Sequence, residues 1–189
     1  MTVGNSGTPL VLAENGHAIG RYVLNGGTLV LNKPCVIGNA FLVRRGGKVT
    51  HDANNSPEDV SPNGIDVVTG GNVIIEDEAS VDAEGKGWAV NKGYGAARGT
   101  DTTNGSAGSH GGVGSIDSST LTNWTCYGSV LHPVTLGSGG KGTAGGGRVR
   151  IIAGGDLQLD GYVGAKGAIF DLTEREQLGG SIEGGDLHI

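Results

Sequence analysis

The stretch at residues 146–155, "GGRVRIIAGG", holds a short alternating run of apolar residues between two pairs of glycines. A glycine pair followed by such a run recurs along the chain, as "GGTLVL" at 26–31, "GGKVTH" at 46–51, "GGNVII" at 70–75, "GGDLQL" at 154–159 and "GGDLHI" at 184–189. Alternation predicts strands that bury one face. Because glycine tolerates positive φ, each pair is expected where a strand turns a corner.

The spacing of the glycine pairs predicts the architecture. The first three pairs begin at residues 26, 46 and 70, which are 20 and 24 residues apart, and repeats of this length are typical of solenoids. We therefore predict one all-β domain over residues 1–189, a single-stranded right-handed parallel β-helix of about five or six coils. Its inward side chains are expected to include Leu29, Leu31, Val149 and Ile151.

Two further comparisons bear on the repeat. The stretches "NVIIEDEASVDAEGKG" at 72–87 and "DLQLDGYVGAKG" at 156–167 share a strand, an acidic turn and a glycine-rich end, which suggests that Ile74 and Leu157 are equivalent inward positions. The last strand, "GGDLHI", is followed by no cap, although a solenoid needs one over its last coil. This predicts that the sequence is a fragment of a larger protein; the alternative is an edge strand at the end that is protected in another way.

Residues 85–147 interrupt the repeat. The segment holds 18 glycines but few alternating runs, and it carries half of the eight aromatic residues, namely Trp88, Tyr94, Trp124 and Tyr127. Long insertions of this kind are usually functional or disordered, and the aromatic content argues against disorder. We interpret the segment as a folded-back, glycine-rich excursion from one coil.

The run "GSHGGVG…YGS…P…LGSGGKGTAGGGRVRIIAGGDLQLDGYVGAKG" resembles a glycine-rich β-helical region found in large bacterial secreted and surface proteins. The resemblance covers roughly residues 83–167 and implies an extracellular or cell-surface setting, beside a catalytic or surface-anchoring domain. In architecture the chain is also similar to β-helical carbohydrate-binding modules.

Composition narrows the classes of partner. The net charge of −6 argues against nucleic acid, and no apolar run approaches the length of a membrane span. The first residues do not form a signal peptide, so the protein is expected either to be cytoplasmic or to have lost a leader. Cys35 and Cys126 belong to no metal or redox motif; unpaired thiols are the default, and one long-range disulfide is the alternative in a secreted protein.

The sequence offers few catalytic constellations. Ser109 and His110 are adjacent, and adjacent residues of an extended chain point in opposite directions, so we interpret His110 as a hydrogen-bonding residue of a glycine loop. The acidic residues of the run "EDEASVDAE" at 76–84 occupy both odd and even positions, so they would not all lie on one face of a strand. This indicates a solvated turn rather than paired catalytic acids. Calcium is the functional alternative there, with Glu76, Asp77 and Asp82 as candidate ligands. No other cofactor is predicted.

The aromatic residues of the excursion carry the functional hypothesis. Flat Trp and Tyr rings stack on the apolar faces of sugars, so we predict a non-catalytic module for an extracellular polysaccharide, such as the plant cell-wall glycan xylan. The alternatives are a β-helix glycoside hydrolase or polysaccharide lyase, and a structural stalk of an adhesin. The basic excess of residues 86–150 favours a polymer that bears uronic acid. The predicted contacts are Trp124, Tyr127, Trp88 and Tyr94, with Arg98 and Lys92 beside them.

Overall fold

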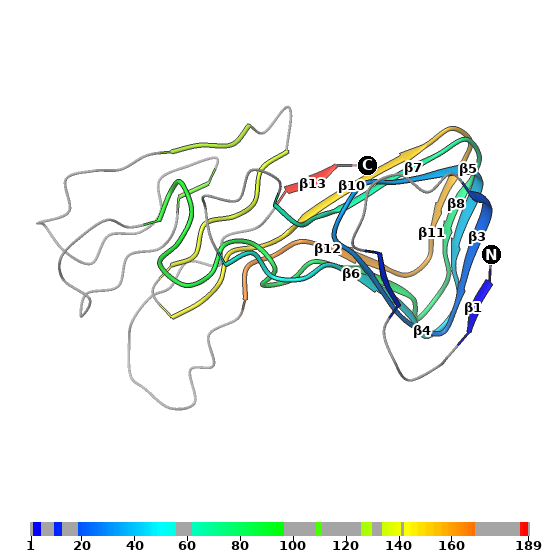
Figure 1. Ribbon diagram of the computed structural model, residues 1–189, viewed down its shortest axis with the longest axis horizontal. Helices are drawn as coiled ribbons and strands as arrows, with labels where there is room; N and C mark the ends of the chain where they lie inside the picture. The colour runs from blue at the N-terminus through cyan, green and yellow to red at the C-terminus, as the bar shows by residue number, and fades with distance from the viewer. Residues whose placement is uncertain are drawn as a thin grey trace, which may run out of the picture.

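The computed structural model describes residues 2–4, 10–12, 19–55, 62–96, 109–110, 126–129, 134–140, 142–168 and 186–188. All regular secondary structure among these residues consists of β-strands (Figure 1). The strands are β1 (Thr2–Gly4), β2 (Leu10–Leu12), β3 (Ile19–Asn25), β4 (Gly27–Leu31), β5 (Cys35–Val43), β6 (Gly47–Thr50), β7 (Ile65–Thr69), β8 (Val73–Ile75), β9 (Ser80–Asp82), β10 (Arg148–Ala153), β11 (Leu157–Leu159), β12 (Tyr162–Gly164) and β13 (Asp186–His188).

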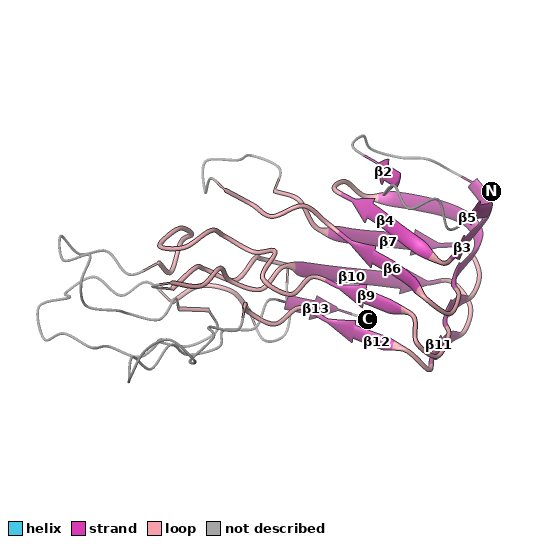
Figure 2. Cartoon of the chain, turned by 90° about the horizontal axis from the view of Figure 1, so that it is seen from below, coloured by secondary structure: helices cyan, strands magenta, loops and turns pink. Residues whose placement is uncertain are grey.

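The strands form two sheets in which every pair is parallel. Sheet A has eight strands, six of them in the order β1-β3-β5-β7-β10-β13, while β8 pairs with β5 and β11 beside this path. Sheet B has five strands in the order β12-β9-β6-β4-β2. The chain passes back and forth between the sheets, so that neighbours within a sheet come from successive passes (Figure 2).

The predicted single-stranded right-handed parallel β-helix is therefore wrong. The described strands form two all-parallel sheets of unequal size instead of one stack of equivalent coils. The nine-residue strand β5 shows the irregularity most clearly, because its first part pairs with β7 and its last part pairs with β8. The strand lengths also vary, from three residues in β8 to nine in β5, whereas a regular repeat would give similar lengths.

The spacing of the glycine pairs predicted a regular β-helix wrongly because the same dipeptide has two different roles in the fold. Gly26 and Gly46 adopt φ of 75° and 73° and turn the chain from sheet A to sheet B, as predicted for corners. Gly70 and Gly154 instead permit close stacking of backbones inside sheet A. A Cβ on Gly70 would lie 2.4 Å from the carbonyl oxygen of Gly38, and one on Gly154 would lie 2.6 Å from that of Gly70.

The core lies between the sheets and confirms most of the expected inward positions. Leu29, Leu31 and Val149 are at most 1% exposed, and Ile151 is 2% exposed. The expected equivalence of Ile74 and Leu157 is wrong by one residue, because strand β11 pairs Leu157 with Val73. A one-residue change of register moves a side chain to the other face of a strand. In β8 both Val73 and Ile75 are buried while Ile74 is only partly buried, and Leu157 is itself exposed.

Two predictions from composition can be placed in the fold. Cys35 is buried and Cys126 is exposed, and both thiols are free, so the two cysteines do not form the alternative disulfide. Within the described ranges, no helix has the length and apolarity to span a membrane.

Candidate functional site

The described parts of residues 85–147 extend away from the sheets as glycine-rich segments without regular strands (Figure 1, green and yellow). Three of these segments, 87–89, 137–140 and 145–147, are joined by backbone hydrogen bonds in all three pairings. The N–H of Trp88 donates to Gly137 at 3.0 Å, that of Gly87 to Gly145 at 2.8 Å, and that of Gly137 to Gly146 at 2.9 Å. We call this arrangement the glycine bundle.

The glycine bundle depends on the absence of side chains. A Cβ on Gly145 would lie 2.1 Å from the carbonyl oxygen of Gly137, and one on Gly139 would lie 2.0 Å from that of Ala89. Such distances are far inside van der Waals contact, so alanine at either position would push the segments apart. The glycines of the excursion therefore bring backbones together, and the side chains between them are left to face outward or to fill gaps.

Asn54 fastens the bundle to the chain that leaves sheet B. Its side chain donates to the carbonyl oxygens of Asn63 at 3.2 Å and Lys86 at 2.9 Å, and it accepts from the N–H of Asn63 at 2.7 Å. Its backbone also bonds to Gly87 and Ala89. A buried amide with this many partners fixes the position of segment 87–89 relative to Asn54 and Asn63.

Trp88 lies inside the bundle. It is only 2% exposed, and Gly93 makes room for its ring, since a Cβ there would lie 2.5 Å from Cδ1. The indole Nε1 is buried without a hydrogen-bond partner in the structure. Trp88 was predicted as a ligand contact, but a ring enclosed in this way is not open to a polymer and serves as support for its neighbours.

Four aromatic rings form a row that leads from the bundle to its surface. The ring centroids of Trp88 and Tyr94 are 6.2 Å apart, those of Tyr94 and Tyr127 are 5.8 Å apart, and those of Tyr127 and His110 are 4.8 Å apart. All three contacts are edge-to-face, a favourable geometry for aromatic pairs. Tyr94 is 54% exposed and is the most open ring of this aromatic row, whose other surface members, Tyr127 and His110, are half-buried.

Hydrogen bonds hold the aromatic row in place. The Tyr127 hydroxyl donates to the carbonyl oxygen of Leu136 and accepts from Ser138 Oγ at 2.7 Å, and Ser138 Oγ in turn accepts from the N–H of Gly95 at 2.9 Å. His110 Nε2 lies 2.9 Å from Thr135 Oγ1, in agreement with its expected role in a glycine loop. These bonds fix the positions of Tyr127 and His110.

The other predicted contacts are only partly placed. Lys92 is exposed two residues before Tyr94, and its carbonyl oxygen accepts from Gly139 in the bundle. Trp124 and Arg98 lie outside the described residues. The structure thus brings Tyr94, Tyr127 and Lys92 to one glycine-rich region of the chain, and it adds His110, which the sequence had not marked as a ligand contact.

The predicted calcium ligands are engaged by cationic side chains. Glu76 lies 4.0 Å from Arg44, Asp77 lies 3.0 Å from Arg45, and Asp82 lies 2.9 Å from Lys48. Among the described residues, no group of three or more His, Cys, Asp or Glu side chains is arranged to hold a metal ion. A calcium ion would therefore have to displace these cations, and calcium binding stays a prediction from the sequence.

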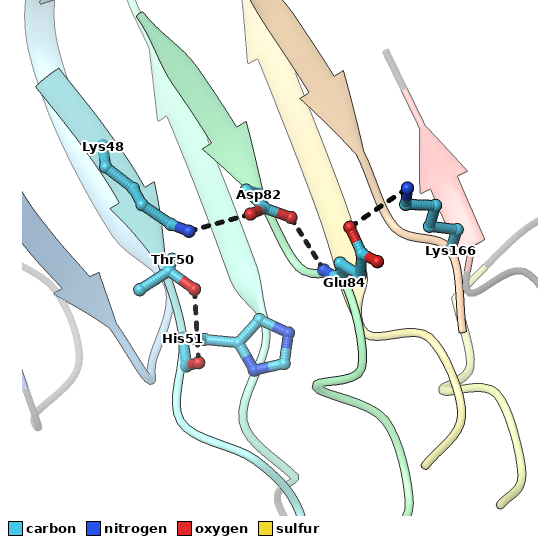
Figure 3. A network of polar contacts seen from close by, with 6 residues as sticks. All are labelled: Lys48, Thr50, His51, Asp82, Glu84 and Lys166. Atoms are coloured by element: carbon cyan, nitrogen blue, oxygen red, sulfur yellow. Dashed lines mark hydrogen bonds and ion pairs between the residues drawn. The ribbon is translucent and has the colours of Figure 1, made fainter. Parts of the chain in front are cut away.

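His51 is a buried residue that sequence analysis had not singled out. It follows β6 where the chain leaves sheet B (Figure 3). Its ring is fully buried. Nδ1 lies 2.9 Å from the carbonyl oxygen of Asp52, and the N–H of Arg148 donates to Nε2 at 3.4 Å. A neutral ring with its proton on Nδ1 satisfies both partners. Burial, assisted by the charges of Lys86 and Arg148 and opposed by the bond to Asp52, lowers the pKa of His51 to about 4.

The outward face of sheet B is a second surface that sequence analysis missed. Figure 3 shows Lys48, Asp82, Glu84 and Lys166 side by side on its strands and their continuations, joined as the ion pairs Lys48–Asp82 and Lys166–Glu84. Burial alone would raise the pKa of the Asp82 carboxyl, but the hydrogen bonds from Lys48 and the Glu84 N–H outweigh it and the pKa is lowered. Asp82 is therefore ionised at neutral pH.

No family model, curated protein or solved structure matches this chain.

Proposed function

We propose that the chain is a non-catalytic module that binds an extracellular polysaccharide through the aromatic row. The observation that carries the proposal is the exposure of Tyr94, a 54% exposed ring held edge-to-face between two other aromatic rings. A fixed ring offers an apolar surface to the C–H face of a sugar at little cost in side-chain entropy. The glycine bundle beneath the ring is held together by backbone hydrogen bonds rather than by bulky side chains.

The chemistry around the ring suits a polyhydroxylated polymer. The exposed ammonium group of Lys92, two residues away in sequence, would interact with hydroxyl or carboxylate groups, which agrees with a polymer that carries some uronic acid. Plant cell-wall glycans such as xylan are the first class to test. The resemblance to secreted and surface proteins supports an extracellular or cell-surface location, beside a catalytic or anchoring domain of a longer chain.

The structural stalk is a second candidate function, and the burial of Trp88 favours it. A stalk uses its aromatic residues to fill gaps between glycine segments, as Trp88 does at 2% exposure. The exposed ring of Tyr94 is not explained by this role, since it leaves half of a large apolar surface in water. The enzyme alternative has less support, because the carboxylates of residues 76–84 that it would use are paired with Arg44, Arg45, Lys48 and Lys166.

The proposal is tested by binding to a panel of soluble and insoluble polysaccharides with Tyr94→Ala and Tyr94→Phe variants. Loss of the ring should weaken binding by about five- to tenfold, whereas phenylalanine should retain most of the affinity. Val36→Ala removes an apolar side chain of sheet A that is 45% exposed and serves as the matched control. The same samples are analysed for released sugars.

Three outcomes are distinguishable. If the Tyr94→Ala variant melts normally and binds every ligand of the parent chain, the aromatic row is not the binding surface. If the parent chain binds no polysaccharide at all, the stalk is the better assignment. Release of reducing or unsaturated ends would show that the chain is an enzyme.

A further inference from the structure

The register of sheet B places a set of side chains on one outward face. Lys48 of β6 pairs with Ser80 of β9, and Ser80 pairs with Tyr162 of β12, so these three residues form a row across three strands. The next residue in each strand points inward, and the buried residues Val49 and Val81 confirm the parity. Two residues further along, Asp82 of β9 lies beside Gly164 of β12 on the same face.

Tyr162 lies along its own strand over Gly164. A Cβ built on Gly164 would be 2.1 Å from the Tyr162 hydroxyl oxygen and 2.4 Å from Cζ, so the ring occupies the space that a side chain at position 164 would need. The ring is nevertheless 46% exposed. Glycine at position 164 thus lets Tyr162 lie against the sheet with much of its surface open to solvent.

The polar groups beside Tyr162 are balanced in charge. Asp82 is paired with Lys48 at 2.9 Å, and Lys166 is paired with Glu84 at 3.2 Å. Each pair is partly exposed and retains free hydrogen-bonding capacity, since a carboxylate accepts about four bonds and an ammonium donates three. A charged ligand would compete with a partner already in place, whereas neutral hydroxyl groups can bond to the pairs as they are.

We propose that this face of sheet B is a binding subsite for a neutral sugar ring, which stacks on Tyr162 while its hydroxyl groups bond to the Asp82–Lys48 and Glu84–Lys166 pairs. The subsite rests on the proposed function for the class of its ligand, but it uses none of the residues of the aromatic row. It differs from that row in preference, because its charges cancel while Lys92 beside Tyr94 is a cation. One chain would then bind a polymer at two surfaces with different selectivity.

The test uses the full chain labelled with 3-fluorotyrosine, because the sequence contains four tyrosines and each gives one ¹⁹F resonance. Single Tyr→Phe variants assign the resonances, and buried Tyr22, which is 1% exposed, is the internal control. The probes are neutral xylose and glucose hexasaccharides with β-1,4 linkages and a hexamer of galacturonic acid. We expect the neutral probes to shift the Tyr162 resonance and leave that of Tyr22 unchanged, and the acidic probe to affect Tyr162 less.

Affinity measurements complete the test. Tyr162→Ala should reduce the affinity for the neutral hexasaccharides by about five- to tenfold, and Tyr162→Phe should not. A shift at Tyr94 with none at Tyr162 would overturn the subsite and leave the proposed function standing. A shift at Tyr162 with none at Tyr94 or Tyr127 would support the subsite and remove the aromatic row. No shift at any tyrosine would overturn both.

Discussion

The buried ring of His51 should make the stability of this protein strongly dependent on pH. The neutral ring accepts from the N–H of Arg148, and a proton on Nε2 would place two donors face to face beside the charges of Lys86 and Arg148. The pKa of His51 is lowered from 6.5 to about 4 in the folded chain. At about 1.4 kcal/mol for each pKa unit, this difference corresponds to about 3 kcal/mol.

The sign of the effect follows from proton uptake on unfolding. Between pH 6.5 and about 4 the unfolded chain binds a proton at His51 that the folded chain does not bind. The contribution to stability is therefore complete above pH 6.5 and is lost as the pH falls toward 4. A loss of about 3 kcal/mol is a large part of the roughly 5–15 kcal/mol that stabilises a typical domain, so acid should open the junction between sheet B, β10 and the glycine bundle.

The assay is urea unfolding at a series of pH values, followed by tryptophan fluorescence, for the parent chain and for His51→Gln. Glutamine does not titrate in this range, so the variant should be less stable at neutral pH but should lose about 3 kcal/mol less on acidification. His110→Gln is the control, because it removes a half-buried histidine of the aromatic row and should leave the steep pH dependence intact. Equal pH dependence of the parent chain and His51→Gln would refute the reasoning.

Two further predictions concern the glycine bundle and the thiols. Gly145→Ala should destabilise the chain by about 1–3 kcal/mol through the clash with Gly137, while Gly20→Ala, which meets nothing within 4 Å, should change the stability by less than about 0.5 kcal/mol; equal effects in thermal melts would contradict this. A colorimetric thiol assay should detect exposed Cys126 in the native chain and buried Cys35 only in denaturant. Burial also raises the pKa of the Cys35 thiol, which makes it less reactive in the folded chain. Detection of two native thiols, or none, would disprove the assignment.

The alternating runs predicted the buried faces of strands because a two-residue period depends only on local sequence. Leu29, Leu31, Val149 and Ile151 are buried for this reason. The arrangement of the strands was not predictable in the same way. Glycine pairs look alike in sequence whether they turn a corner, as at Gly46, or permit contact with a backbone from another pass of the chain.

The site shows the same division between local and non-local information. The concentration of aromatic residues directed attention to Tyr94. Whether a ring is exposed depends on what packs against it, and Gly93 leaves room for the ring of Trp88 inside the bundle. His51 was missed because its partner Arg148 is 97 residues away. Tyr162 had a local signal, an aromatic residue two positions before a glycine within one strand, which indicates a ring that lies along the strand.

The glycine bundle has a consequence for the uniqueness of the fold. Side chains normally specify which residue of one segment faces which residue of the next, and glycine segments offer almost none. Neighbouring segments could shift by one residue and keep nearly the same number of backbone hydrogen bonds. Their register therefore depends on the few side chains that fix it, such as Asn54 and the enclosed ring of Trp88. Substitution of either side chain should therefore produce several coexisting registers, visible as multiple NMR signals for bundle residues, before it produces a large loss of stability.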